Sequence, residues 1–195
     1  MSLFFRVFFL SLGLVACSTI PQVPPVTAWE PLDWTQWRLQ GRMALRYQDK
    51  NWNVSLRWQQ YPTTYNMVLQ GPLGVGTIRI DVDEQQAHLT DSDGHQQVAA
   101  SAEQLLYNQT GMRLPLSRLR YWVLADYTVI KADEQTLDAQ GRPVSVVQDG
   151  WIIHYKRYQV INGYVVPRLI YLQGKDVELR LVIDQLEPLL SSRHE

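Results

Sequence analysis

Side chains able to support catalysis or metal binding are few, and their spacing fits no common reaction site. No serine lies in a G-x-S-x-G elbow, and the chain has no Walker phosphate loop. Residues 91–94 resemble part of a calcium loop but lack its first ligand and its closing glutamate, so we interpret them as a turn. No zinc-binding HExxH pair occurs among the four histidines, which are His88, His95, His154 and His194. We therefore expect no enzyme activity, no metal and no cofactor.

The single cysteine instead has the surroundings expected for covalent attachment of lipid. Residues 1–16 carry Arg6 and then an apolar run of ten residues, too short to cross a bilayer as a helix and typical of an export signal. The run ends at Leu14-Val15-Ala16-Cys17, which resembles the lipobox of bacterial lipoproteins. We expect cleavage after residue 16 and acylation of Cys17. An ordinary signal peptide with a chance cysteine is the alternative.

The residues after Cys17 predict a destination and a tether. In lipoproteins of diderm bacteria, Asp after the cysteine commonly retains the protein at the inner membrane, and Ser18 stands here instead. Its presence is compatible with the outer membrane. Four prolines in residues 17–36 exclude a helix or central strand and favour an extended tether. We expect a folded domain over residues 37–195.

That domain has the composition and periodicity of β structure. Hydrophobic residues make up 46% of the chain and the net charge is only -1, which argues against disorder and against nucleic-acid binding. Apolar or small residues alternate with polar ones over residues 37–48, as expected for a half-buried strand. Further such patterns predict nine to eleven strands, and these would close or nearly close into a barrel.

Two short helices should interrupt the strands. Residues 101–104 match a capping box, and Gly111 suits the end of the helix that follows. Residues 115–125 carry an apolar stripe that includes Leu119 and Trp122. The apolar residues that face inward could line a cavity for acyl chains or fill a solid core, and composition leaves both open.

Two surface features are each open to two interpretations. The loop Gly71–Gly76 has an apolar tip, which is either tucked under or exposed for a purpose. Arg38, Arg42 and Arg46 share one face of the first strand. That basic face could steer an acidic protein, rest on anionic head groups, or simply be solvated.

Several segments resemble the LolB family of outer-membrane lipoproteins, over roughly residues 37–184. They are Thr110–Leu124, Gly71–Gly74, Gln148–Trp151 and Tyr155–Tyr158. Gly71, Arg113 and Ala125 stand where the family commonly has Asn, Pro and Gly, which affects only local turns.

The resemblance implies a mainly β fold, an incomplete (unclosed) antiparallel β-barrel of about eleven strands with a helical lid. It implies a monomer that accepts lipoproteins from a LolA-like periplasmic carrier and inserts them into the inner leaflet of the outer membrane. A lipid-binding lipoprotein without an insertase role is the alternative. The implied membrane-insertion loop comprises Pro72, Leu73, Gly74 and Val75. The implied acyl-chain cavity is lined by Met43, Leu45, Trp52, Leu56, Trp58, Met67, Ile80, Leu119 and Trp122.

Overall fold

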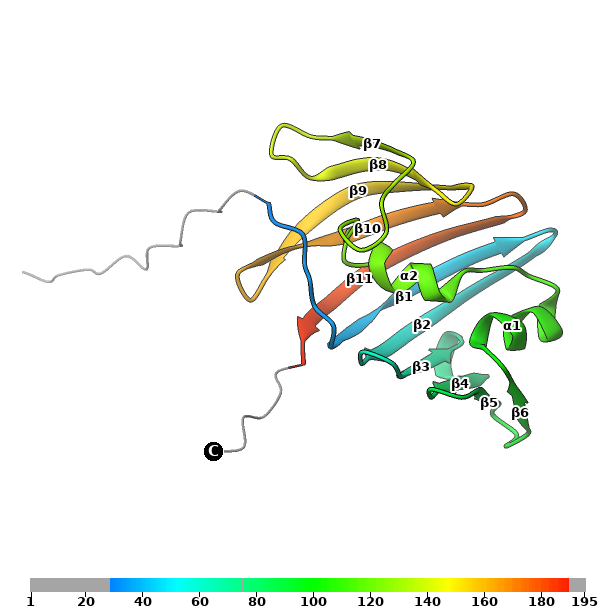
Figure 1. Cartoon of the computed structure of the whole chain (residues 1–195). Helices are drawn as coiled ribbons and strands as arrows, with labels where there is room; N and C mark the ends of the chain where they lie inside the picture. The colour runs from blue at the N-terminus through cyan, green and yellow to red at the C-terminus, as the bar shows by residue number, and fades with distance from the viewer. Residues whose placement is uncertain (1–28, 75, 190–195) are drawn as a thin grey trace, which may run out of the picture.

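Eleven strands form one antiparallel sheet in the computed structural model, which describes residues 29–74 and 76–189 (Figure 1). The strand order across the sheet is β6-β5-β4-β3-β2-β1-β11-β10-β9-β8-β7. The strands are β1 (Trp37–Tyr47), β2 (Lys50–Gln60), β3 (Tyr65–Gln70), β4 (Thr77–Val82), β5 (Ala87–Thr90), β6 (Gln96–Ala99), β7 (Glu134–Leu137), β8 (Pro143–Gln148), β9 (Trp151–Ile161), β10 (Tyr164–Gln173) and β11 (Val177–Pro188).

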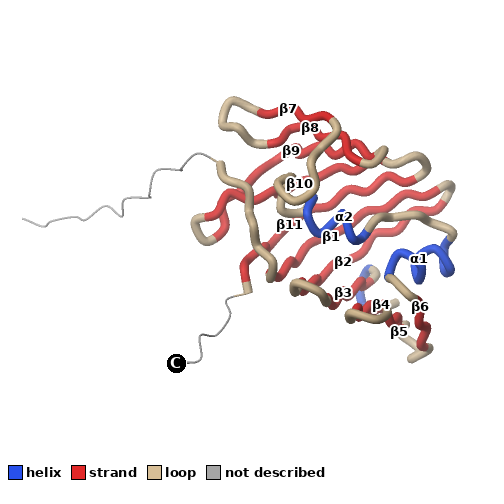
Figure 2. The backbone as a smooth tube through the Cα atoms, in the orientation of Figure 1, coloured by secondary structure: helices blue, strands red, loops and turns tan. Residues whose placement is uncertain are grey.

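The sheet is open, with β6 at one edge and β7 at the other. Helices α1 (Ala102–Thr110) and α2 (Leu116–Trp122) lie against one side of it, in the connection between the two edges (Figures 1 and 2). We call the side that carries the helices the inner face and the opposite side the outer face. The expected unclosed antiparallel fold with a helical element is confirmed. Among the described residues, no helix has the length and apolar character needed to cross a membrane.

Strand β1 shows why the sequence folds this way. Its odd-numbered residues are mostly buried on the inner face and its even-numbered residues point outward, as the alternation predicted. A register shift after Gln40 leaves Gly41 opposite Ile183 of β11. A Cβ atom on Gly41 would lie 2.3 Å from the carbonyl oxygen of Val182, so only glycine fits this position.

We expect Gly41→Ala to destabilise the protein by about 2–3 kcal/mol, because the backbone of β1 and β11 must separate to admit a methyl group. Gly141→Ala is the matched control, since a Cβ there meets nothing within 4 Å and adds only the strain of a positive φ, about 1 kcal/mol. Urea unfolding of both variants measures the difference. Equal losses of stability would show that the contact with Val182 is relieved without cost.

Two expectations need correction: the position of the turn after β1 and the capping box of α1. The alternation over residues 37–48 predicted a strand as far as Gln48, but β1 ends at Tyr47 and the turn to β2 lies at residues 48–49. Ser101 accepts a hydrogen bond from the Gln104 backbone at 3.2 Å, but the Gln104 side chain bonds Asn108 and does not close the capping box. Neither detail alters the fold.

The segment before β1 packs on the domain as far back as it is described. Leu32 is buried in the core, and Trp29 and Trp34 lie against it. The Trp34 ring meets the Tyr164 ring edge-on, with centroids 4.8 Å apart. Residues 29–36 therefore pack on the domain, and any tether lies before residue 29. The proposed signal segment and Cys17 lie outside the described residues.

Candidate functional site

The predicted cavity residues gather on the inner face, where they form one apolar cluster. Eight of them have less than a tenth of their surface exposed, and Trp52 is half-buried beside them. The eight are Met43, Leu45, Leu56, Trp58, Met67, Ile80, Leu119 and Trp122. Sheet and lid both contribute, because Leu119 and Trp122 belong to α2. The cluster is packed between the sheet and α2.

The end of α2 is clamped to the sheet by buried hydrogen bonds. The Trp122 indole donates to Gln148 Oε1 at 2.6 Å, and the Tyr155 hydroxyl donates to the Trp122 carbonyl at 2.8 Å. Burial raises the pKa of Tyr155 well above its ordinary value, so its hydroxyl stays protonated and can donate. Gln148 in turn donates to the carbonyls of Ile130 and Lys131. These bonds fix the C-terminal end of the lid on β8 and β9.

Exposed polar contacts also hold the lid, on α1 and on Asp149 in the turn that follows β8. The Ser117 amide donates to Glu103 Oε1 at 2.7 Å, and Arg118 forms a 2.9 Å ion pair with Asp149. A hollow of about 370 Å³ lies between α1, α2 and strands β3 and β4, with Tyr65 in its lining. The Tyr65 ring contacts the Trp58 ring, with centroids 5.9 Å apart. This hollow is the natural approach from solvent to the inner apolar cluster.

One polar atom within the cluster lacks a partner. The Trp58 indole Nε1 is buried and makes no hydrogen bond among the described residues. An unpaired buried donor costs about 1–3 kcal/mol. A carbonyl oxygen from the ester or amide link of an acyl chain would be a suitable acceptor. The site thus combines an apolar surface with one donor that such a ligand can use.

The loop between β3 and β4 exposes its apolar tip. Pro72–Gly74 form a tight turn that is kinked at Leu73, and the side chain of Leu73 is fully exposed to solvent. Leu73 has φ 56°, in the left-handed region that leucine rarely adopts. The Gly71 amide donates to the Gly76 carbonyl at 3.0 Å and closes the loop. Of the two interpretations left open by the sequence, the exposed tip is confirmed for Leu73; Val75 lies outside the described residues.

The basic face of β1 is neutralised by its neighbour. Each of its three arginines forms an ion pair with a carboxylate of β11. The pairs are Arg38 with Glu187, Arg42 with Asp184 and Arg46 with Glu178. The sequence could not indicate this, because the partners lie more than 130 residues away.

Sequence reasoning missed the residues that hold the lid. Nothing in the sequence pattern predicted a hydrogen bond from Tyr155 to the α2 backbone. Gln148, which begins one of the segments that resemble the family, is the buried last residue of β8. The sequence signal for this clamp is the presence of Gln148 beside the apolar residues of β8.

Comparison with known proteins identifies relatives that cover most of the chain. The family described as "Outer membrane lipoprotein LolB" matches residues 35–185. An outer-membrane lipoprotein LolB of Alkalilimnicola ehrlichii is 33% identical to this chain, and the match covers 89% of this chain and 90% of the relative. One from Nitrosococcus oceani is 32% identical, covering 84% of this chain and 85% of the relative. In structure, a LolA superfamily protein from Nitrosomonas europaea is similar in fold, with TM-score 0.53, 9% identity, and coverage of 83% of this chain and 89% of that one.

Proposed function

The chain belongs to the outer-membrane lipoprotein LolB family, and we propose that its inner face receives acyl chains and its Leu73 loop passes them to the membrane. The family consists of lipoprotein receptors of the outer membrane that act without enzymatic chemistry. The protein is therefore an outer-membrane lipoprotein that faces the periplasm. What remains to be assigned is which residues carry out reception and delivery.

The observation that carries the proposal is the full exposure of Leu73. A leucine gains about 1.5–3 kcal/mol on moving from water into an apolar phase. The domain forgoes that gain by holding Leu73 at the tip of a closed loop in a backbone conformation unfavourable for leucine. Such an arrangement is useful if the leucine enters a bilayer and disturbs lipid packing where the cargo is released.

The acyl chains of the cargo need protection from water until that point. Each methylene contributes about 0.8 kcal/mol, so exposing one long chain costs on the order of 10 kcal/mol. The apolar cluster of the inner face supplies a suitable surface, and Trp58 supplies a donor for a carbonyl. We propose that the contact between Ser117 of α2 and Glu103 of α1 opens first, because it is an exposed hydrogen bond that water can replace.

The bonds from Gln148 and Tyr155 to Trp122 would then act as the hinge side of the lid. Because they are buried, breaking them leaves unpaired polar groups, whereas the opposite side can exchange its bonds with water. The lid would thus swing away from β3 and β4 and widen the existing hollow beside Tyr65. Acyl chains would enter beneath Leu119 and Trp122.

We propose a LolA-like periplasmic carrier as the donor. A hydrophobic cargo cannot cross water freely, so reception must proceed directly from one apolar cavity to another. No phosphate-loop motif is present to couple the step to nucleotide hydrolysis, so the transfer should run downhill in affinity. We expect the receiver to act as a monomer.

Cys17 is proposed as the acylated anchor. Two or more acyl chains hold a protein stably on a membrane, whereas one does not. Eleven residues, and so twelve Cα-to-Cα steps, separate Cys17 from Trp29, where the described domain begins. A chain of that length reaches at most about 43 Å, enough for the domain to turn its loop toward the membrane surface.

Leu56→Gln tests the inner face as the acyl-binding surface. Leu56 is 2% exposed, so a glutamine there leaves polar atoms unpaired and should cost about 1–3 kcal/mol of stability. We also expect affinity for a fluorescent fatty acid to fall about tenfold. Titration of the purified protein, at a temperature where the variant is folded by circular dichroism, measures it.

Val160→Gln is the matched control, because Val160 is exposed on β9 and should change neither stability nor binding. Unchanged fatty-acid affinity in folded Leu56→Gln would indicate that the inner face is a solid core. In that case acyl chains bind elsewhere, and the alternative of a lipoprotein with a different lipid-binding role gains support.

A further inference from the structure

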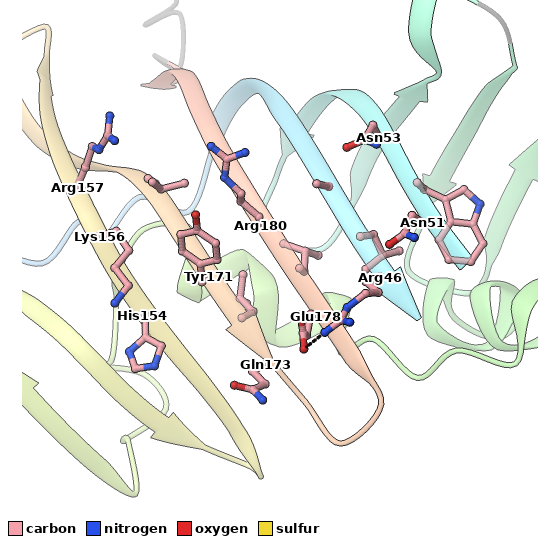
Figure 3. A pocket seen from close by; sticks show the side chains of 16 residues that line it. Arg46, Asn51, Asn53, His154, Lys156, Arg157, Tyr171, Gln173, Glu178 and Arg180 are labelled. Atoms are coloured by element: carbon pink, nitrogen blue, oxygen red, sulfur yellow. Dashed lines mark hydrogen bonds and ion pairs between the residues drawn. The ribbon is translucent and has the colours of Figure 1, made fainter. Parts of the chain in front are cut away.

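A second hollow region lies on the outer face, away from the lid. A groove of about 750 Å³ runs over β2, β1, β11, β10 and β9 (Figure 3). A hollow of about 460 Å³ adjoins it. The two share Ala44, Asn53, Arg157, Leu169 and Arg180 in their linings, so they form one continuous surface. We call it the outer groove. The helices lie on the opposite side of the sheet, although Met43, Leu45 and Trp52 of the inner cluster also border the groove.

The outer groove is strongly basic, although the chain as a whole carries a net charge of only -1. Its lining contains six cations and one carboxylate, Glu178. Arg42 and Arg46 are paired with Asp184 and Glu178. In the described part of the chain, Lys156, Arg157, Arg168 and Arg180 form no ion pair. We call these four the free cations. Arg168 donates a hydrogen bond to Gln159 Oε1, and the Arg180 guanidinium lies over the Tyr171 ring.

The free cations come from three neighbouring strands and line one surface. Lys156 and Arg157 come from β9, Arg168 from β10 and Arg180 from β11, so three strands bring together like charges that repel one another. Figure 3 shows Lys156 and Arg157 on β9 pointing in opposite directions, with Tyr171 and Arg180 on the neighbouring strands β10 and β11. Guanidinium groups donate paired hydrogen bonds that match phosphate oxygens, and an ammonium group adds a point charge. An anion of phosphate type would relieve the repulsion.

The groove is also continuous with the apolar loop. Pro72, the residue before the exposed Leu73, lines the outer groove together with Arg157, Arg168 and Arg180. Basic residues beside an exposed apolar side chain are the combination that binds the surface of an anionic membrane. A carrier protein with an acidic patch could use the charge, but it would not explain why a solvent-exposed leucine stands at the same edge.

We propose that the outer groove binds the phosphate headgroup of an anionic phospholipid and so orients the loop for entry into the bilayer. This inference rests on the proposed function of Leu73. The headgroup lies over β9, β10 and β11 while the leucine side chain reaches the acyl region. The groove thereby sets which side of the domain meets the membrane.

Binding of soluble short-chain lipids tests the proposal without requiring membrane insertion. The acylated full chain, in a neutral maltoside detergent, is titrated calorimetrically with dihexanoyl-phosphatidylglycerol, dihexanoyl-phosphatidylcholine and inorganic phosphate. We expect phosphatidylglycerol to bind most tightly. Arg157→Gln/Arg180→Gln and Lys156→Gln/Arg168→Gln should each weaken that binding by about 10- to 30-fold, because each cation near an anionic surface contributes about fivefold.

Arg113→Gln is the control, since Arg113 is an exposed arginine outside the groove. Unchanged phosphatidylglycerol binding in both double variants would overturn the proposal. Equal affinity for inorganic phosphate would instead show a site for free phosphate, and loss of carrier binding with lipid binding intact would show a protein-docking surface. Leu73→Glu should still bind the short-chain lipid. Lipid binding therefore tests the groove, whereas delivery into a bilayer tests the loop, and each proposal can fail without the other.

Discussion

Leu73→Glu is expected to reduce delivery of lipoprotein into a bilayer at least tenfold while leaving reception from the carrier intact. Leu73 is fully exposed and contacts no part of the core, so its replacement should not disturb folding. A carboxylate resists entry into hydrocarbon, by several kcal/mol at membrane depth. This variant should therefore still accept lipoprotein from the carrier but fail to deliver it into the bilayer. Transfer of a labelled lipoprotein from a LolA-like carrier, scored first on this protein and then in liposomes, measures both steps.

Leu137→Glu is the matched control for that experiment. Leu137 is an exposed leucine on β7, at the edge of the sheet, and its substitution should leave both steps unchanged. Normal delivery by Leu73→Glu would contradict the insertion role of the loop. It would then favour a lipoprotein that binds lipid but does not insert cargo.

Cys17→Ala is expected to remove acylation and, with it, stable attachment to the outer membrane. The chain has no other cysteine that could carry a thioether-linked lipid. Metabolic labelling with a radioactive fatty acid should fall to background, and the protein should leave the membrane fraction. Ser18→Ala should retain the label. Persistent labelling of Cys17→Ala would show that the lipobox interpretation is wrong.

The strands of this fold were predictable wherever one face is buried. In β1 the alternation of apolar and polar residues corresponds directly to burial, because the inner face packs on the lid and the outer face meets solvent. Strand β7 gave no such signal, since all four of its residues are exposed and it is held by pairing with β8. Edge strands of this kind depend on a neighbour rather than on their own pattern.

The candidate site was predictable in its apolar part and less so in its polar part. The inward positions of residues such as Leu56 and Met67 follow from periodicity. The clamp between Trp122 and Gln148 does not, because it joins residues 26 apart through side-chain atoms whose direction depends on the tertiary fold.

Charge on the outer face illustrates the same limit. The sequence drew attention to three arginines on β1, and pairing with β11 neutralises them. The free cations were not singled out, because they are scattered over residues 156–180 of the sequence. Pairing of β9, β10 and β11 places them on one surface. Local sequence shows the sign of a charge, and strand order determines which charges meet.

The most direct test of the account follows one acyl chain through the protein. A lipoprotein whose acyl chain carries a diazirine is loaded on a LolA-like carrier, mixed with this protein and liposomes, and irradiated at successive times. We predict cross-links first to inner-face residues such as Leu56, Met67 and Leu119, and then to liposome lipid; in Leu73→Glu the inner-face cross-links should persist. Cross-links confined to the outer face, or transfer to lipid with no inner-face intermediate, would contradict the account.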